Sequence, residues 1–205
     1  MVGLARRNLE SLSPLTLLRP ADRPALVPGQ PCVWALALPG QNPRPAARAQ
    51  LRLLLAGYLG LAPDQLALSL EPGRAPRLEQ RWRGQPLFLS LSHARDAALL
   101  ALCPGVPIGV DLAEVEPMPD CAAVAELYLG PRAAARLATL AGPERDAAFA
   151  RAWATLEARG KCLGLGLAEW SAARARQLDE RAFALAATDW QASARRYVIA
   201  LAQPR

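Results

Sequence analysis

Three strand-like runs follow one another in the middle of this chain, and they constrain its fold more than any other stretch. Residues 87–93 (LFLSLSH) alternate apolar and polar side chains, which is the period of a β-strand. Residues 97–102 (AALLAL) and 106–112 (VPIGVDL) are apolar runs on either side of Pro104-Gly105. Because a Pro-Gly pair favours a turn, we expect these two apolar runs to pair as a hairpin.

Helical patterns lie on both sides of the strand-like runs. Residues 46–61 carry apolar side chains at helical spacing, and residues 144–163 form the strongest helical pattern in the chain. Short apolar runs at 32–38, 183–187 and 197–202 indicate further strands. Since helices and strands mix without a regular βαβ alternation, the sequence predicts an α+β fold.

The chain offers one clear border between two parts. Its 205 residues are enough for one large domain or two small halves. Residues 113–120 are acidic and rich in proline, which is typical of a loop. We therefore predict an N-terminal half at residues 1–112, beginning with an irregular arm over residues 1–30, and a C-terminal half at residues 113–205.

The overall charge favours an anionic partner. The formal net charge is +6 and the sequence pI is about 9.8. A nucleic-acid-binding module is disfavoured, because the basic residues form no stripe or tail and aromatic residues make up only 5% of the chain. Lys and Arg together number 24, yet Lys161 is the single lysine, and His93 is the single histidine. Both are therefore candidates for specific roles.

The cysteines and the hydropathy pattern exclude two further classes of protein. Four cysteines are scattered without a C-x-x-C pair, which indicates reduced thiols rather than a zinc site or a disulfide scaffold. No uninterrupted apolar run of about 18 residues occurs, and the apolar stretch after Arg7 is short and broken. We expect a cytoplasmic protein with no membrane span and no signal peptide.

The strongest helical pattern aligns three chemically different side chains. Trp153, Glu157 and Lys161 are spaced i, i+4 and i+8, which places them on one face of the helix. An exposed Glu–Lys pair is the ordinary interpretation. A tryptophan on the same stripe indicates instead that this face is at least partly buried, where a carboxylate and an ammonium need a reason to be present.

Asp111 stands at the end of an apolar run, where a charged side chain also needs a reason to be present. A buried acid is costly unless it is paired or binds a cation, although a strand that simply ends in a turn is the plain alternative. Asp111 and Glu157 together would suit a hard cation such as Mg²⁺, which takes one or two carboxylates and completes its shell with water and phosphate. Such a site fits phosphoryl transfer.

His93 follows the alternating run directly, and a lone histidine there is more often solvated than a ligand. In a positive cleft it could contact an anion. The chain contains neither G-x-S-x-G, G-x-G-x-x-G nor G-x-x-x-x-G-K-[ST], so a serine-hydrolase elbow and the common phosphate loops are excluded.

Three segments stand in a distinctive order, namely residues 90–102 (SLSHARDAALLAL), 108–112 (IGVDL) and 149–167 (FARAWATLEARGKCLGLGL). Their order and spacing resemble those of the 4'-phosphopantetheinyl transferases of the long, surfactin-synthetase type. That family carries a His-Ser pair after a strand, then Gly-x-Asp-x-Glu, then Trp-x-x-Lys-Glu-Ala-x-x-Lys. Softer likeness covers most of residues 32–202. The single histidine and the single lysine both fall on motif positions.

The resemblance implies two similar α/β halves related by a pseudo-twofold axis, with coenzyme A and Mg²⁺ in the cleft between them. It implies Mg²⁺-dependent transfer of the phosphopantetheine arm of coenzyme A to a serine of an apo acyl or peptidyl carrier protein, releasing 3',5'-ADP. A monomer that binds neither nucleic acid nor membrane is expected. The implied roles are metal ligands for Asp111 and Glu157, the base for Glu157, a phosphate contact for Lys161, a 3'-phosphate contact for His93, and nucleotide contacts for Arg48, Arg52 and Arg74.

The chain departs from the family pattern at several positions. Ala113 stands where the second acid of Gly-x-Asp-x-Glu is common, and Glu114 would point to the other side of a continuing strand. Ala94 replaces the motif serine, Leu156 replaces the lysine before Glu157, and the upstream Gly-Lys-Pro element reads PGRAPRL at residues 72–78. A degenerate relative that binds coenzyme A or a carrier protein without turnover is therefore an alternative. An Arg-rich nucleic-acid-binding module is a third.

Overall fold

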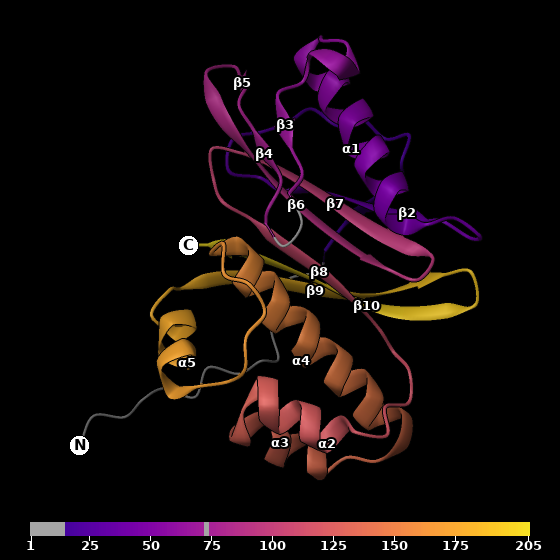
Figure 1. Cartoon of the computed structure of the whole chain (residues 1–205), viewed down its shortest axis with the longest axis vertical. Helices are drawn as coiled ribbons and strands as arrows, with labels where there is room; N and C mark the ends of the chain where they lie inside the picture. The colour runs from indigo at the N-terminus through magenta and orange to yellow at the C-terminus, as the bar shows by residue number, and fades with distance from the viewer. Residues whose placement is uncertain (1–14, 72–73) are drawn as a thin grey trace.

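The computed structural model describes residues 15–71 and 74–205, and its centre is formed by two β-sheets that lie against each other (Figure 1). The five-stranded sheet has the order β1-β2-β7-β6-β5, and the three-stranded sheet has the order β8-β10-β9. A two-stranded sheet joins β3 to β4. The strands are β1 (Leu17–Leu18), β2 (Cys32–Ala37), β3 (Leu68–Ser69), β4 (Arg77–Leu78), β5 (Arg81–Trp82), β6 (Gln85–Ala94), β7 (Ala97–Pro104), β8 (Gly109–Glu114), β9 (Phe183–Ala192) and β10 (Arg195–Pro204).

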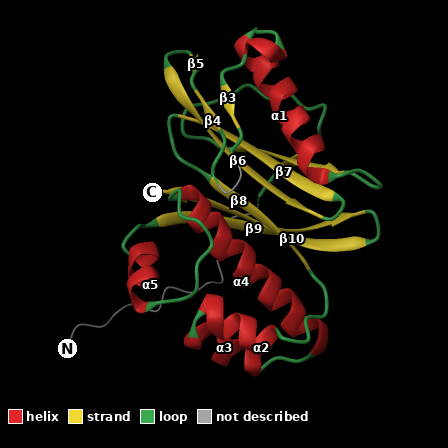
Figure 2. Ribbon diagram, viewed as in Figure 1, coloured by secondary structure: helices red, strands yellow, loops and turns green. Residues whose placement is uncertain are grey.

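Helices cover the outer faces of the two sheets (Figure 2). Helix α1 packs on the five-stranded sheet and α4 on the three-stranded sheet. The helices are α1 (Pro43–Leu59), α2 (Cys121–Val124), α3 (Pro131–Ala138), α4 (Gly142–Cys162) and α5 (Ala172–Asp179), with a 3₁₀ turn η1 (Pro63–Gln65) and a π-helical turn η2 (Ala125–Leu129). The mixture of helices and strands expected from the sequence is confirmed.

The alternation of side chains along the strands builds four layers. One face of β7 packs Leu100 and Leu102 against α1. The opposite face packs Leu99 against the three-stranded sheet, which contributes Val110 and Ile199. Because β7 is covered on both faces, every one of its residues is buried, which explains its continuous apolar sequence. The layer order is α1, five-stranded sheet, three-stranded sheet, α4.

The prediction of a hairpin around Pro104-Gly105 is wrong. Strand β7 pairs with β6 through the short turn at Arg95-Asp96, and its other edge pairs with β2. Both edges of β7 are therefore taken, and β8 pairs with β10 in the other sheet. Residues 105–108 carry the chain from one sheet to the other, so the Pro-Gly pair turns the chain without pairing the strands that flank it.

Most of the other expected elements are confirmed, with somewhat different bounds. Helix α1 begins at Pro43 because the Asn42 side chain accepts a hydrogen bond from the Arg44 backbone N–H, and it ends at Gly60 in the left-handed conformation. Strands β9 and β10 extend the two runs predicted near the C-terminus, because each residue from 183 to 192 has a partner in β10. None of the described helices is long and apolar enough to cross a membrane.

Strand β8 runs across residue 112, the position of the predicted border between halves, and lies entirely in the three-stranded sheet. The division at residue 112 stays a prediction. Of the irregular arm predicted for residues 1–30, residues 1–14 lie outside the described residues.

Candidate functional site

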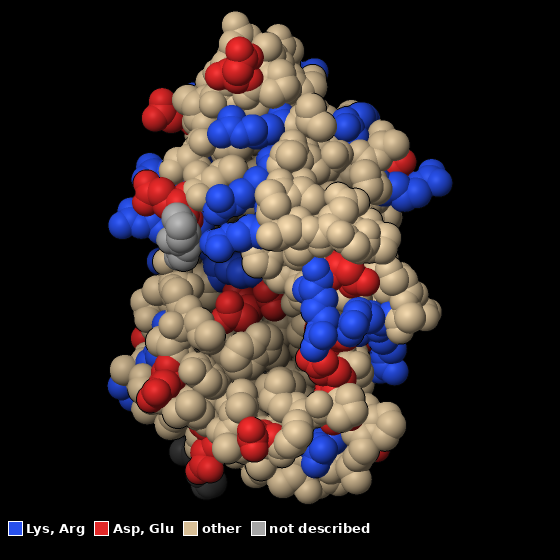
Figure 3. Space-filling model, turned by 45° about the vertical axis from the view of Figure 1, so that its right-hand side comes forward, with Lys and Arg blue, Asp and Glu red and all other residues tan. Residues whose placement is uncertain are grey.

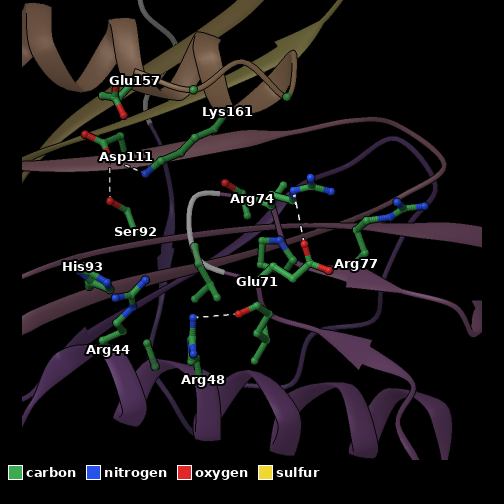
Figure 4. A pocket seen from close by; sticks show the side chains of 18 of the residues that line it. Arg44, Arg48, Glu71, Arg74, Arg77, Ser92, His93, Asp111, Glu157 and Lys161 are labelled. Atoms are coloured by element: carbon green, nitrogen blue, oxygen red, sulfur yellow. Dashed lines mark hydrogen bonds and ion pairs between the residues drawn. The ribbon is translucent and has the colours of Figure 1, made fainter. Parts of the chain in front are cut away.

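A cavity of about 680 Å³ is lined by residues from both sheets and from the helices that cover them (Figure 4). In the space-filling view, basic side chains follow one wall of a hollow whose floor carries acidic side chains (Figure 3). One wall is formed by α1, β4, the residues before β4, and β6, and it contributes Arg44, Arg48, Arg74, Arg77 and His93. The opposite side is formed by β8, α4 and the residues after α4, and it contributes Asp111, Glu157, Lys161, Leu165 and Leu167.

The acidic floor is built where β8 meets α4. Alternation along β8 turns Asp111 toward α4 and away from the face that packs between the sheets. Glu157 and Lys161 are one turn apart on α4 and both face the cavity, as the helical spacing predicts. The Lys161 Nζ donates to Asp111 Oδ1 at 2.7 Å and to the Val110 carbonyl oxygen at 3.2 Å. The structure thus brings together the three residues expected to carry the chemistry.

Two buried serines of β6 reach the free edge of β8. The Ser92 hydroxyl donates to Asp111 Oδ1 at 2.6 Å and accepts from the Leu112 N–H at 3.4 Å. The Ser90 hydroxyl accepts from the Val110 N–H at 3.0 Å. Sequence reasoning missed both serines, because a polar residue in an alternating strand is normally assigned to the solvent side. Here the polar positions face the second sheet.

The charges on the cavity floor affect the pKa of Glu157. Burial raises the pKa of Glu157, and the negative charge of Asp111 raises it further. Lys161 and Arg174 act in the opposite direction. A cation beside Glu157 and Asp111 would favour the ionised form of Glu157 that the neighbouring negative charge disfavours.

This donor set fits a magnesium ion. Asp111 Oδ1 accepts from Ser92 and Lys161, whereas Asp111 Oδ2 has no hydrogen-bond partner within residues 15–71 and 74–205. No group of three or more His, Cys, Asp or Glu side chains suited to a metal occurs in the same described residues. Two carboxylates are nevertheless enough for Mg²⁺ when water and phosphate oxygens complete its shell.

The basic wall combines four arginines with His93. Arg48 Nη2 donates to the Leu70 carbonyl oxygen at 3.0 Å, and Arg74 Nε lies 3.3 Å from Glu71 Oε2. Arg52, expected from the sequence to contact the nucleotide, does not line the cavity. It lies one turn farther along α1, and its Nη1 is 3.4 Å from the Pro63 carbonyl oxygen. Arg44 and Arg77, which sequence reasoning did not single out, do line the cavity.

Glu114 and Trp153, also singled out in the sequence, do not line the cavity. Glu114 is on the opposite face of β8 from Asp111, as alternation predicts, and pairs with Arg95 at 3.0 Å and with Arg195. Trp153 packs on the Phe149 ring at a centroid distance of 5.9 Å, which confirms that its side of α4 is partly buried. Of the upstream segment at residues 72–78, residues 72 and 73 lie outside the described residues.

Comparisons with known proteins indicate a family for this chain. The family model of the 4'-phosphopantetheinyl transferase superfamily matches residues 107–202, which include Asp111, Glu157 and Lys161. The 4'-phosphopantetheinyl transferase HetI of Nostoc sp. is 34% identical over 124 residues, covering 60% of this chain and 52% of HetI. The Synechocystis sp. protein slr0495, named for the same activity, is 32% identical over 164 residues, covering 75% of this chain and 66% of slr0495.

The chain therefore spans between about half and two thirds of the length of these relatives. The range matched by the family model includes the acidic floor and α4, whereas the basic wall lies before residue 107. The chain belongs to the 4'-phosphopantetheinyl transferase superfamily.

Proposed function

We propose that this protein transfers the 4'-phosphopantetheine arm of coenzyme A to a serine hydroxyl of an apo acyl or peptidyl carrier protein and releases 3',5'-ADP. The observation that carries the proposal is one cavity in which Asp111, Glu157 and Lys161 face a wall of arginines. That arrangement offers an acidic site for a cation and a basic surface for a polyanionic co-substrate.

Asp111 and Glu157 would hold Mg²⁺, which when bound would neutralise charge on the pyrophosphate. The Lys161 ammonium lies beside Asp111 at the cavity wall, where it can stabilise the charge that develops on phosphoryl oxygens. Arg48, Arg74 and His93 would bind the nucleotide phosphates of coenzyme A. This division leaves the phosphorus open to attack by an incoming hydroxyl.

Glu157 is the residue suited to accept the proton of the carrier serine. Burial raises its pKa, and a base whose pKa lies nearer to neutral transfers protons more effectively. The serine oxygen forms the new bond to phosphorus, the bond to the oxygen of 3',5'-ADP breaks, and the serine proton passes to Glu157 or to water. Each step uses groups that the cavity brings within one site.

The finer family assignment is also a proposal. We propose the long, surfactin-synthetase-type branch, with two similar halves related by a pseudo-twofold axis and divided near residue 112. The presence of a helix-covered sheet on each side of the cavity supports this arrangement. A monomeric, cytoplasmic enzyme that binds neither nucleic acid nor membrane is the corresponding expectation.

Ala113 favours one alternative function. It leaves the described part of β8 without a second acid beside Asp111 on the α4 face. A relative with weakened cation binding could bind coenzyme A or a carrier protein without turning over. The intact ion pair between Lys161 and Asp111 and the placement of Glu157 favour the active transferase.

Intact mass spectrometry of an apo carrier protein tests the proposal. After incubation with this protein, coenzyme A and Mg²⁺, the carrier should gain one phosphopantetheine, roughly 340 Da, and EDTA should prevent the gain. Absence of a gain across acyl and peptidyl carriers, together with coenzyme A binding in calorimetry, would establish the non-catalytic alternative.

Two arginines one turn apart on α1 provide a second test. Arg48→Ala should raise KM for coenzyme A about tenfold, because it removes a charge-assisted contact at the cavity wall. Arg52→Ala should raise KM much less, because Arg52 lies outside the cavity. Steady-state kinetics with varied coenzyme A measures both. Equal effects of the two substitutions would contradict this placement of the nucleotide.

A further inference from the structure

We propose that Ser92 is a positioning residue that orients the Asp111 carboxylate for a divalent cation. The inference deepens the proposed function, because it concerns the acidic floor of the same cavity. Ser92 and Asp111 are both buried, with 7% and 5% of their surfaces exposed. The Ser92 hydroxyl and Asp111 Oδ1 are 2.6 Å apart, which is a short, charge-assisted hydrogen bond between two different sheets.

Two donors converge on one carboxylate oxygen. Asp111 Oδ1 receives hydrogen bonds from Ser92 and from Lys161, whose Nζ is 2.7 Å away. Two donors on Oδ1 restrict rotation of the carboxylate about its terminal bond. Asp111 Oδ2, which has no hydrogen-bond partner among the described residues, is left available for a ligand on the side of Glu157 (Figure 4).

The Ser92 hydroxyl has less conformational freedom than the Lys161 ammonium. Lys161 has a long flexible stem, and its side chain is 28% exposed in the cavity. Its ammonium would also be drawn to the phosphates of a bound co-substrate. Ser92 has a single side-chain torsion to its oxygen and sits in a strand paired with Leu99 of β7. Its hydroxyl also accepts from the Leu112 N–H, which fixes the direction of its proton toward Asp111.

Removal of this hydroxyl should weaken cation binding directly. Groups that orient a metal ligand typically change metal affinity by about 10–100-fold when they are removed. We expect Ser92→Ala to raise the Kd for Mn²⁺, measured by electron paramagnetic resonance with and without coenzyme A, by about tenfold. Ser92→Thr retains the hydroxyl on a side chain that suits a strand and should restore most of the affinity.

Ser90→Ala is the matched control. Ser90 is also buried on the same strand, but its hydroxyl accepts from the Val110 N–H and makes no hydrogen bond to Asp111. Both alanine variants should lower the melting temperature, because each leaves a buried backbone N–H without a partner. Ser92→Ala should lower it further, because it also removes the hydrogen bond to Asp111. Only Ser92→Ala should weaken Mn²⁺ binding.

The proposal is overturned if Ser92→Ala binds Mn²⁺ as tightly as the unmodified protein, or if Ser90→Ala weakens binding as much. It is also overturned if the unmodified protein binds no Mn²⁺ in either condition. Failure of the transferase proposal has a different signature: Mn²⁺ binding depends on Ser92, yet no carrier protein gains mass.

Discussion

Glu157→Gln is expected to lower the rate of phosphopantetheinyl transfer about a thousandfold while the fold stays intact. The substitution removes the proton acceptor, and general-base catalysis typically contributes about 10²–10⁴-fold. It also removes one of two carboxylates that would hold the cation. The rate is measured from the time course of carrier mass gain at saturating coenzyme A and Mg²⁺.

The stability of this variant distinguishes a chemical role from a structural one. The pKa of the Glu157 carboxyl is higher in the folded state than in the unfolded chain. Ionisation of this carboxyl therefore lowers the free energy of unfolding as the pH rises above its pKa in the unfolded chain. A neutral amide lacks that penalty, so Glu157→Gln should unfold at the same temperature as the unmodified protein or higher. Glu144→Gln, in the exposed first turn of the same helix, is the control and should retain full activity. Near-normal turnover of Glu157→Gln would show that the base lies elsewhere.

Lys161→Arg is expected to lower kcat/KM about a hundredfold although it keeps the positive charge. Loss of one group that stabilises transition-state charge typically costs about 10²–10³-fold. The Lys161 ammonium fits between Asp111 Oδ1 and the Val110 carbonyl oxygen as a compact point charge. A planar guanidinium is larger and directs its donors differently, so it cannot reproduce both contacts.

Lys161→Met separates charge from shape in the same position. It leaves the buried Asp111 carboxylate without its ion-pair partner and should destabilise the fold by about 3 kcal/mol, measured by urea unfolding. Arg151→Lys exchanges one cation for another elsewhere on α4, where Arg151 pairs with Asp189, and should leave kcat/KM unchanged. Unchanged kinetics in Lys161→Arg would reduce the single lysine of the chain to a coincidence of composition.

The acidic floor of the cavity could be predicted because its geometry is local. Helical spacing alone aligns Glu157 with Lys161, and the position of Asp111 at the end of an apolar run marks it as a buried acid in need of a partner. Their approach across two elements was implied by the family resemblance and is observed in the structure. Local periodicity was therefore sufficient to place Asp111 on a strand and Glu157 and Lys161 on a helix. The family motif supplied the expectation that these two elements meet.

The parts that could not be predicted depend on which elements meet in space. The period of a strand does not identify its neighbour, so β7 and β8 were paired through their Pro-Gly turn although they belong to different sheets. The same limitation concealed Ser90 and Ser92, whose polar face meets another sheet and not solvent. Arg52 lies one helical turn from Arg48. Arg48 lines the cavity and Arg52 does not, and no pattern in the sequence distinguishes the two residues.

The alternation of β6 has a consequence for how this sequence can change. Leu87, Leu89 and Leu91 on one face complete the core beneath α1, while Ser90 and Ser92 on the other face meet β8. A single-residue insertion within this strand would exchange the two faces, placing leucines against Asp111 and serines in the core. Any insertion or deletion inside β6 that displaces the serines would therefore also disrupt the core. Selection against a disrupted core should remove such changes, so the spacing between the leucines and the serines is inherited as one unit.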